Sequence, residues 1–231
     1  MPAKASGPGV FEPVDEFEGG VGWIAHPDET MQRTGHALVD DGDVWLVDPV
    51  DAGGLDDHLN RLGTVRGVVV LFNYHRRDAA AIARRHGVSM LLPAEMHALD
   101  ETDIDAPVDH FDGQLGRTDY RLREVARSRL WQEWALFDGE TLVVAESLGT
   151  AGYFRAPGER LGVSLLRRLT PPRSTLGKLA PDRILCGHGE GVFTDASGAL
   201  SAALKNARRT APHMYVRNAT TLARNLAAAM R

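Results

Sequence analysis

Histidine and carboxylate side chains are the groups in this sequence best suited to metal chemistry. The 231 residues include nine histidines but a single cysteine, Cys186, which excludes an internal disulfide and a cysteine-rich zinc module. A metal ion would therefore need imidazole and carboxylate ligands. His188 stands out because Gly187 and Gly189 flank it directly after a short apolar run, and glycines let the backbone approach closely.

Two other side chains near these groups have simpler explanations. Cys186 precedes His188 by two residues, but no third residue that would orient the histidine as a general base is evident. Cys186 is therefore predicted to be a buried core thiol. His75 lies in an expected loop beside Asn73, where it either contacts a ligand or hydrogen-bonds to the backbone.

Composition restricts the class of protein. With 43% hydrophobic and 25% charged residues, the chain is predicted to form a globular domain rather than a disordered tail. The formal charge is −5 and no basic block occurs, so we expect no nucleic-acid partner. The longest apolar run, Val68 to Phe72, is too short to span a bilayer, and no signal-peptide pattern begins the sequence. We expect a cytoplasmic protein without a membrane partner.

The periodicity of apolar residues predicts alternating strands and helices. Strands are expected at 21–25, 37–39, 44–47, 68–72, 88–92, 122–125, 130–137, 141–145 and 184–186. Helices are expected at 55–62, 78–86, around 163–169, and at 196–211 and 213–230, the last two divided at Pro212. Turn signals at 40–43 and 138–139 indicate two antiparallel meanders, and the strand–helix–strand unit over 68–92 indicates a parallel crossover.

These elements predict one domain over residues 1–231. Residues 1–20 carry no period and are expected to form a loose arm, and residues 93–119 an irregular excursion. Two sheets that pack on each other with helices outside them fit the alternation, because each sheet then buries both faces. The C-terminal helices, within 196–231, are expected to cover one sheet.

Four segments, in this order and at these intervals, resemble the metallo-β-lactamase fold family. They are DGDVWLVDP at 41–49, VVVLFNYHRRDAAAIARRHGVSMLLPAEM at 68–96, WALFDGETLVVAESL at 134–148 and ILCGHGEGV at 184–192. The resemblance covers nearly the whole chain. It implies an α+β fold, a four-layer αββα sandwich with two mixed β-sheets flanked by helices.

The same resemblance implies an eroded version of the family's dinuclear metal site. When the His-x-His-x-Asp-His signature is anchored on Asp78, Tyr74 and Arg76 replace the first two histidines and Ala79 the third. No histidine occurs between His110 and His188, so a further ligand is missing. The resemblance leaves three ligand positions filled, by Asp78, Glu146 and His188.

Two states of such a site follow from these residues. Arg76 would pair with Asp78 and Glu146 in a pocket without metal. Alternatively, Asp78, Glu146 and His188 would hold one divalent ion, Zn²⁺, Mn²⁺ or Fe²⁺. His75 replaces a lost ligand if the loop is shifted by one residue. Tyr74, Arg76, Arg77 and Asn73 are expected to line the pocket.

Three functions follow. The first is a non-catalytic or altered member of the superfamily whose pocket binds a small anionic molecule or a partner through Arg76 and Arg77. The second is a mononuclear metal hydrolase of an ester, thioester or lactone, since one ion lacks the two-metal clamp used on phosphodiesters. The third is a homo-oligomeric scaffold that associates through apolar faces of the C-terminal helices. The catalytic residues of an active form are not identified by the sequence.

Overall fold

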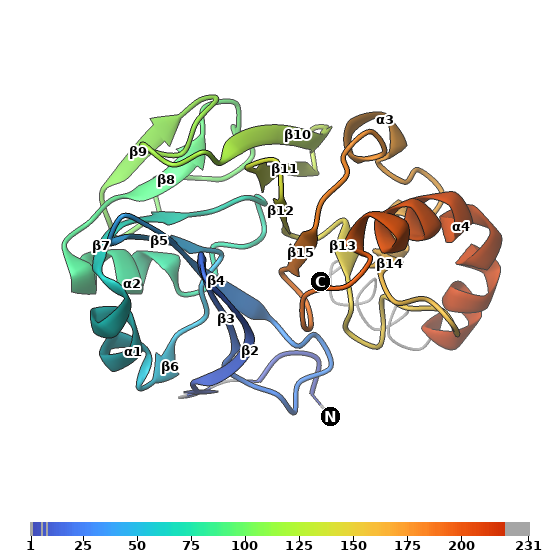
Figure 1. Cartoon of the computed structure of the whole chain (residues 1–231), viewed down its shortest axis with the longest axis horizontal. Helices are drawn as coiled ribbons and strands as arrows, with labels where there is room; N and C mark the ends of the chain where they lie inside the picture. The colour runs from blue at the N-terminus through green and yellow to red at the C-terminus, as the bar shows by residue number, and fades with distance from the viewer. Residues whose placement is uncertain (1, 6, 8, 220–231) are drawn as a thin grey trace.

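Two β-sheets lie between two layers of helices, as the view in Figure 1 shows. The computed structural model describes residues 2–5, 7 and 9–219 of the chain. The element order alternates as the sequence predicts, and the α+β sandwich of two mixed sheets flanked by helices is confirmed.

The larger sheet has seven strands, four from an antiparallel meander and three added in parallel. Its order is β2 (Glu12–Phe17), β3 (Gly20–Ile24), β4 (Thr34–Asp40), β5 (Asp43–Val47), β7 (Thr64–Val69), β8 (Met90–Pro93) and β9 (Val108–Phe111). The predicted crossover is present, because β7 pairs in parallel with β8. Strand β9 lies inside the stretch that was expected to be irregular.

The smaller sheet has four strands in the order β10 (Arg121–Arg127), β11 (Gln132–Phe137), β12 (Thr141–Val144) and β15 (Arg183–Cys186). The first three are antiparallel, and β15 adds in parallel to β12. Two short pairs complete the strands: β1 (Gly9–Val10) with β6 (Ala52–Gly53), and β13 (Leu148–Gly149) with β14 (Gly162–Val163).

Alternation of side chains along the smaller sheet divides the core in two. Leu136, Val143 and Leu185 face the larger sheet, whereas Val144 and Ile184 pack with residues of the C-terminal helix. Strands β11, β12 and β15 therefore bury both faces, whereas the edge strand β10 is largely exposed. The carboxyl ends of β12 and β15 lie side by side, which brings the segments that follow them together.

Helices cover the outer faces of both sheets. They are α1 (Leu55–Leu62), α2 (Ala79–His86), the 3₁₀ turn η1 (Leu165–Arg167), α3 (Arg173–Leu176) and α4 (Ala196–Arg217). Helices α1 and α2 contact the larger sheet, and α4 contacts β14 and β15. Gly63 and Gly87 end α1 and α2 as their sequences indicate, and Gly87 takes the left-handed conformation that suits a helix end.

The C-terminal helix differs from the expected helix pair. Pro212 lies inside α4 instead of dividing two helices. Proline removes one backbone donor, but buried Ala211 and Met214 on either side keep the helix packed on the protein. Leu200 and Leu204 are buried in the core beneath the helix. The expected helix over 213–230 extends beyond the described residues.

The N-terminal segment also differs from the expected loose arm. Strand β2 forms an edge of the larger sheet and pairs with β3 from Glu12 opposite Ile24 to Phe17 opposite Gly20. Its polar sequence, which includes Pro13, hides the strand because an edge strand needs little apolar alternation and tolerates proline. Asp15 accepts a hydrogen bond from the Gly191 amide at 2.7 Å and so ties β2 to the loop after β15.

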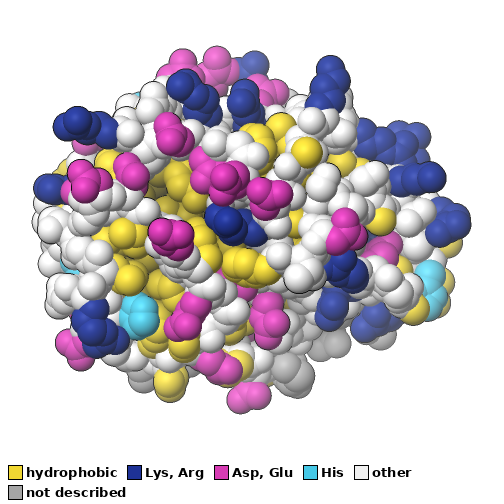
Figure 2. All heavy atoms as spheres, in the orientation of Figure 1, with side chains coloured by type: hydrophobic (Ala, Val, Ile, Leu, Met, Phe, Trp, Pro, Cys, Tyr) yellow, Lys and Arg dark blue, Asp and Glu magenta, His cyan; other side chains and the backbone are white. Residues whose placement is uncertain are grey.

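The surface of the molecule mixes charges of both signs. Figure 2 shows Lys, Arg, Asp and Glu side chains interspersed over one face, with hydrophobic side chains between them. Among the described residues, no helix combines the length and apolar character needed to cross a membrane.

Candidate metal centre

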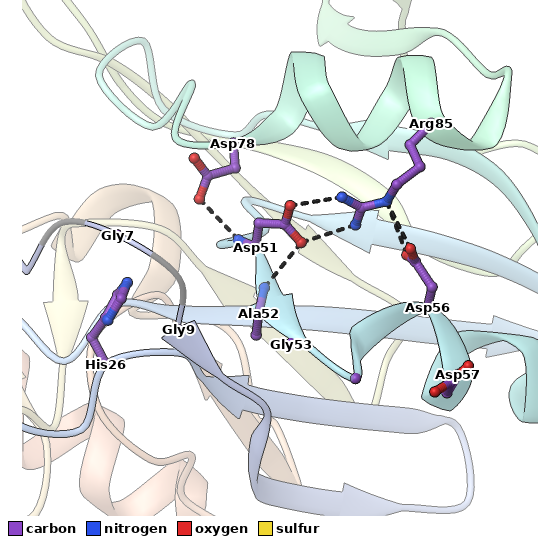
Figure 3. A pocket seen from close by; sticks show the side chains of 11 residues that line it. Gly7, Gly9, His26, Asp51, Ala52, Gly53, Asp56, Asp57, Asp78 and Arg85 are labelled. Atoms are coloured by element: carbon purple, nitrogen blue, oxygen red, sulfur yellow. Dashed lines mark hydrogen bonds and ion pairs between the residues drawn. The ribbon is translucent and has the colours of Figure 1, made fainter.

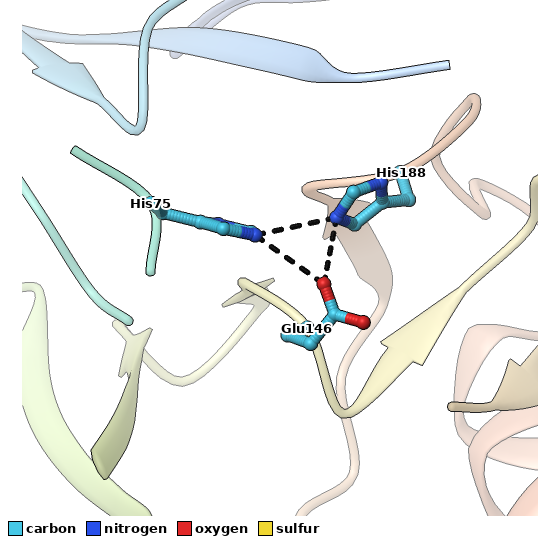
Figure 4. A group of neighbouring side chains, drawn as sticks. All are labelled: His75, Glu146 and His188. Carbon is cyan, nitrogen blue, oxygen red and sulfur yellow. Dashed lines mark hydrogen bonds and ion pairs between the residues drawn. The ribbon is translucent and has the colours of Figure 1, made fainter. Parts of the chain in front are cut away.

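Two histidines and one glutamate from three loops meet at one point, as Figure 4 shows. Glu146 Oε2 lies 2.8 Å from His188 Nε2 and 3.3 Å from His75 Nε2, and the two Nε2 atoms are 3.3 Å apart. His188 and His75 are buried, and the Glu146 side chain is 14% exposed. Within the described residues this is the only group of histidine and acidic side chains with the spacing of metal ligands.

The ends of three strands place these ligands. Glu146 and His188 follow the parallel neighbours β12 and β15, and His75 lies between β7 and α2. The loop carrying His75 is fixed to β11 because Asn73 exchanges two hydrogen bonds with the backbone of Gln132, at 2.9 and 3.1 Å. The ligands therefore come from both sheets.

The glycines around His188 are required by close packing. A Cβ atom at Gly187 would collide with the Ala145 carbonyl oxygen, and one at Gly189 would collide with Thr150. Gly189 also has φ +84°, which side-chain-bearing residues rarely adopt. The close backbone approach that the sequence predicts is thus to the neighbouring loops that contain Ala145 and Thr150. The first of these loops also carries Glu146, which lies next to His188.

The second ring nitrogen of each histidine is committed to an acceptor. His188 Nδ1 lies 2.9 Å from the Met31 carbonyl oxygen, and His75 Nδ1 lies 3.0 Å from Asp48 Oδ2. A carbonyl or carboxylate oxygen only accepts, so each Nδ1 carries a proton, and in its neutral form each ring turns an Nε2 lone pair toward the centre. Such outer hydrogen bonds orient metal-binding histidines in proteins.

Electrostatics favour a cation between the three atoms. Burial lowers the pKa of His188, which favours its neutral form. Burial opposes the ionisation of Glu146, but when the rings are protonated the charge of His188 and the hydrogen bonds from His188 and His75 outweigh it and hold the pKa of Glu146 below its usual range. When both rings are neutral and Glu146 is ionised, two imidazole lone pairs and a carboxylate oxygen face one another, an arrangement that repels unless a positive charge lies between them. The donor set therefore fits a metal ion.

A cavity of about 80 Å³ opens onto this centre. Besides the three ligands and Arg77, it is lined by Lys4, Met31, Arg33, Phe72 and Tyr74. Burial and the nearby guanidinium groups of Arg33 and Arg77 lower the pKa of Lys4. The cavity thus has one aromatic side, from Phe72 and Tyr74, and several cationic side chains.

The structure does not bring Asp78 into the group of ligands. Its carboxylate accepts a hydrogen bond from the Asp51 amide at 2.8 Å, directly before α2. It faces a separate polar pocket of about 530 Å³, shown in Figure 3, where Arg85 pairs with Asp51 and Asp56. His75, which lies one residue from a ligand position of the aligned family signature, joins Glu146 and His188 instead.

Of the two neighbouring arginines that were expected to line the pocket, only Arg77 lies at the cavity. Arg76 is exposed and reaches the Asp100 carbonyl oxygen at 3.4 Å. Arg77 turns inward, and its terminal nitrogens donate to the carbonyl oxygens of Thr34, Asp48 and Gly187. In the described part of the chain, no arginine pairs with Glu146 or Asp78, so the expected Arg76–carboxylate pair is not formed.

Other expected pocket residues have varied positions. Tyr74 is 60% exposed at the cavity rim and lies edge-on to Phe72. Asn73 is buried and serves the backbone of Gln132 rather than the cavity. Sequence reasoning did not identify Asp48 and Met31 as partners of the histidines. Asp48 has a sequence signal, because it ends a strand in the DGDVWLVDP segment, whereas a backbone carbonyl such as that of Met31 has none.

Comparison with solved structures defines the fold. The structure matches TMB-1 with a TM-score of 0.58 at 10% identity, over 86% of this chain and 98% of that chain. It matches a metallo-β-lactamase from Hirschia baltica with a TM-score of 0.55 at 9% identity, over 84% and 98% of the two chains. The mono-zinc form of FIM-1 from Pseudomonas aeruginosa matches with a TM-score of 0.52 at 11% identity, over 87% and 97%.

The protein therefore has the metallo-β-lactamase fold, as the four sequence segments predict. No protein-family model matches the chain, and no curated protein matches it. At these identities the likeness establishes the fold, and the chemistry of the site depends on this chain's own residues.

Proposed function

We propose that this protein binds one divalent metal ion through His75, Glu146 and His188 and hydrolyses a small ester, thioester or lactone. The observation that carries the proposal is the convergence of three acceptor atoms within 3.3 Å while both Nδ1 atoms are hydrogen-bonded outward. Two histidines and one carboxylate form a common ligand set of mononuclear zinc hydrolases and also suit Fe²⁺ and Mn²⁺.

A metal ion in such a site polarises a substrate carbonyl and lowers the pKa of a water molecule. The chain's own residues would prepare the site for that chemistry. Asp48 and the Met31 carbonyl hold the imidazoles in one tautomer and orientation. Phe72 packs against His75 with ring centroids 5.1 Å apart and keeps that side of the ligand group from water.

The cationic lining favours substrates that carry negative charge. Lys4 lines the cavity together with Arg77, whose charge acts through space because its terminal nitrogens donate to carbonyl oxygens, and with Arg33, which is paired with Glu29. A bound divalent ion would add positive charge beside them. One ion lacks the two-metal clamp that stabilises both oxygens of a phosphodiester displacement, so acyl transfer to water is the favoured reaction class.

A metal-free pocket that binds a small anion is the second candidate, and the same cationic lining favours it. In this state a proton would replace the metal ion and one histidine would be an imidazolium paired with Glu146. The two candidates differ in metal content, which can be measured directly. For the oligomeric scaffold, Leu200 and Leu204 of the C-terminal helix are buried within the chain, Val216 is exposed, and the residues beyond 219 lie outside the described part, so this alternative stays a prediction.

Metal analysis of protein purified without chelator tests the proposal. We expect about one equivalent of zinc, manganese or iron, because three protein ligands bind such an ion tightly enough for it to stay bound during purification. His188→Ala and His75→Ala should lose it. His110→Ala is the matched control, because His110 is exposed and pairs with Glu101 away from the cavity.

Hydrolysis of a panel of aryl esters, thioesters and lactones then tests the activity. Turnover should appear on metal loading and disappear with either histidine variant. A wild-type protein that holds no metal even after loading with zinc would contradict the metal site. A protein that holds the ion but hydrolyses none of the three substrate classes would contradict the proposed reaction alone.

A further inference from the structure

Arg77 joins the three segments that surround the metal centre. Its Nη1 donates to the Thr34 carbonyl at 2.7 Å and to the Asp48 carbonyl at 2.6 Å, and its Nη2 donates to the Gly187 carbonyl at 2.8 Å. Thr34 begins β4, Asp48 follows β5 and Gly187 follows β15. One guanidinium group therefore connects both sheets, since β4 and β5 belong to one sheet and β15 to the other.

Two of these three carbonyls, those of Asp48 and Gly187, belong to residues that position a histidine. Asp48 also accepts from His75 through its carboxylate. Gly187 directly precedes His188, and its carbonyl also accepts from the Thr34 amide at 3.0 Å. Contacts of Arg77 therefore lead to both histidines, one through Asp48 and the other through the peptide of Gly187.

The backbone near Arg77 is strained. Arg77 and Asp48 have φ values of +42° and +44°, in the left-handed region that residues with a Cβ rarely adopt. Such conformations persist only where the surrounding structure enforces them. The 2.6 Å hydrogen bond joins these two strained residues directly and so opposes relaxation of either one.

Arg77 is poorly placed to bind a substrate. Both terminal nitrogens already donate to carbonyl oxygens, and Nε is buried without a partner among the described residues. Both Nη1 donors are used by the Thr34 and Asp48 carbonyls, so binding an anion through Nη1 would take a donor from one of them, which costs free energy. The guanidinium thus acts on the protein itself rather than on a ligand.

We propose that Arg77 is a positioning residue that holds His75 and His188 at metal-binding separation, through Asp48 and Gly187. The inference rests on the proposed metal site. Arg77 supplies a fixed cation and three directed hydrogen bonds where a flexible loop would otherwise let the two histidines move apart. The site is then assembled before the ion arrives, which raises the affinity for the ion.

Zinc affinity of Arg77→Gln and Arg77→Lys, measured by competition with a chromophoric chelator, tests this role. We expect Arg77→Gln to bind zinc about 10- to 100-fold more weakly, the usual effect of losing an outer-shell partner. Arg77→Lys should recover part of the loss, because lysine keeps the charge but not the three-way geometry. The absorption spectrum of the Co²⁺-loaded variants should also change, since it reports ligand geometry.

Two controls separate positioning from general destabilisation. Arg76→Gln removes the neighbouring, exposed guanidinium and should leave both affinity and spectrum unchanged. Leu59→Ala removes a fully buried side chain of α1 and lowers stability away from the cavity, so its zinc affinity should match the wild type. If Arg77→Gln does not fold, Arg77→Lys provides the comparison.

The outcomes distinguish the two proposals. Wild-type protein that binds no zinc overturns the metal site and, with it, the role of Arg77. If the wild-type protein binds zinc and both Arg77→Gln and Arg77→Lys match its zinc affinity and its Co²⁺ spectrum, the role of Arg77 alone is overturned. An equal loss of affinity in Leu59→Ala would also overturn it, because stability would then explain the effect.

Discussion

Asp78 and Glu146 are both carboxylates at the ends of core elements, yet only Glu146 faces the histidines. The difference arises from hydrogen-bonding partners: Glu146 lies within 3.3 Å of both imidazoles, whereas Asp78 accepts from the Asp51 amide. His75 reaches the centre because Asp48 accepts its other ring nitrogen. We therefore expect the ligand set to be determined by the hydrogen-bond partner that each side chain finds on its far side, a donor for the carboxylates and an acceptor for the histidines.

Replacing Asp78 tests this assignment. Asp78→Ala should leave the metal content unchanged and lower the free energy of unfolding by about 1 kcal/mol, the usual value of one hydrogen bond of this kind. Metal analysis and urea denaturation measure the two quantities on the same samples. Loss of the ion from Asp78→Ala, with the fold intact, would show that Asp78 is a ligand.

A buried ion pair joins Arg168, directly after η1, to Glu159 in the loop before β14, and Thr210 of α4 hydrogen-bonds to it. Both terminal nitrogens of Arg168 donate to the Glu159 carboxylate, at 2.7 and 3.1 Å, and the Thr210 hydroxyl of α4 donates to it at 2.9 Å. The Arg168 side chain is fully buried. Burial alone would raise the pKa of Glu159, but the bonds from Arg168, the Ala156 amide and Thr210 outweigh it and lower the pKa.

This ion pair predicts a pH dependence of stability. Since the pKa of Glu159 is lower in the folded chain, its contribution is present above the unfolded value of about 4.3 and is lost as pH falls through the folded value. The free energy of unfolding of Glu159→Gln should be about 3 kcal/mol lower than that of the wild type near neutral pH, because Arg168 is left buried without its partner. The difference from wild type should shrink below about pH 4. Urea denaturation across this range measures it, and a constant difference would refute the assignment.

Segments that follow strands of the two sheets meet at the proposed metal centre. His75 follows a strand of the larger sheet, and Glu146 and His188 follow strands of the smaller one. A bound ion would therefore link both halves of the core. Because unfolding separates these ligands, the ion should bind the folded state far more tightly than the unfolded chain.

Thermal unfolding should consequently depend on metal. Free zinc at about 100 times its dissociation constant stabilises the folded state by about 2.7 kcal/mol, which corresponds to a rise in Tm of about 5–10 °C for a chain of this size. Calorimetry with and without chelator measures the shift. His188→Ala should show none, and an equal shift in that variant would mean that zinc binds elsewhere.

Local sequence signals were enough to predict much of the architecture. Gly63 and Gly87 mark the ends of α1 and α2, and turn residues at 40–43 and 138–139 mark the hairpins, because caps and tight turns depend on the backbone freedom of a few adjacent residues. The glycines around His188 likewise indicated a crowded strand end. The polar edge strand β2 and the continuous helix through Pro212 were missed, since sheet pairing and packing outweigh local preference there.

The tertiary structure alone decided which residues form the centre. His75 and His188 are 113 residues apart, and Asp48 meets His75 across 27 residues, so their contacts depend on how two sheets pack. Within the loop, a left-handed Arg77 turns inward while Arg76 points to solvent. A sequence determines periodicity and turns through local sterics, but the direction of a side chain in a loop is set by distant acceptors that only the folded chain brings near.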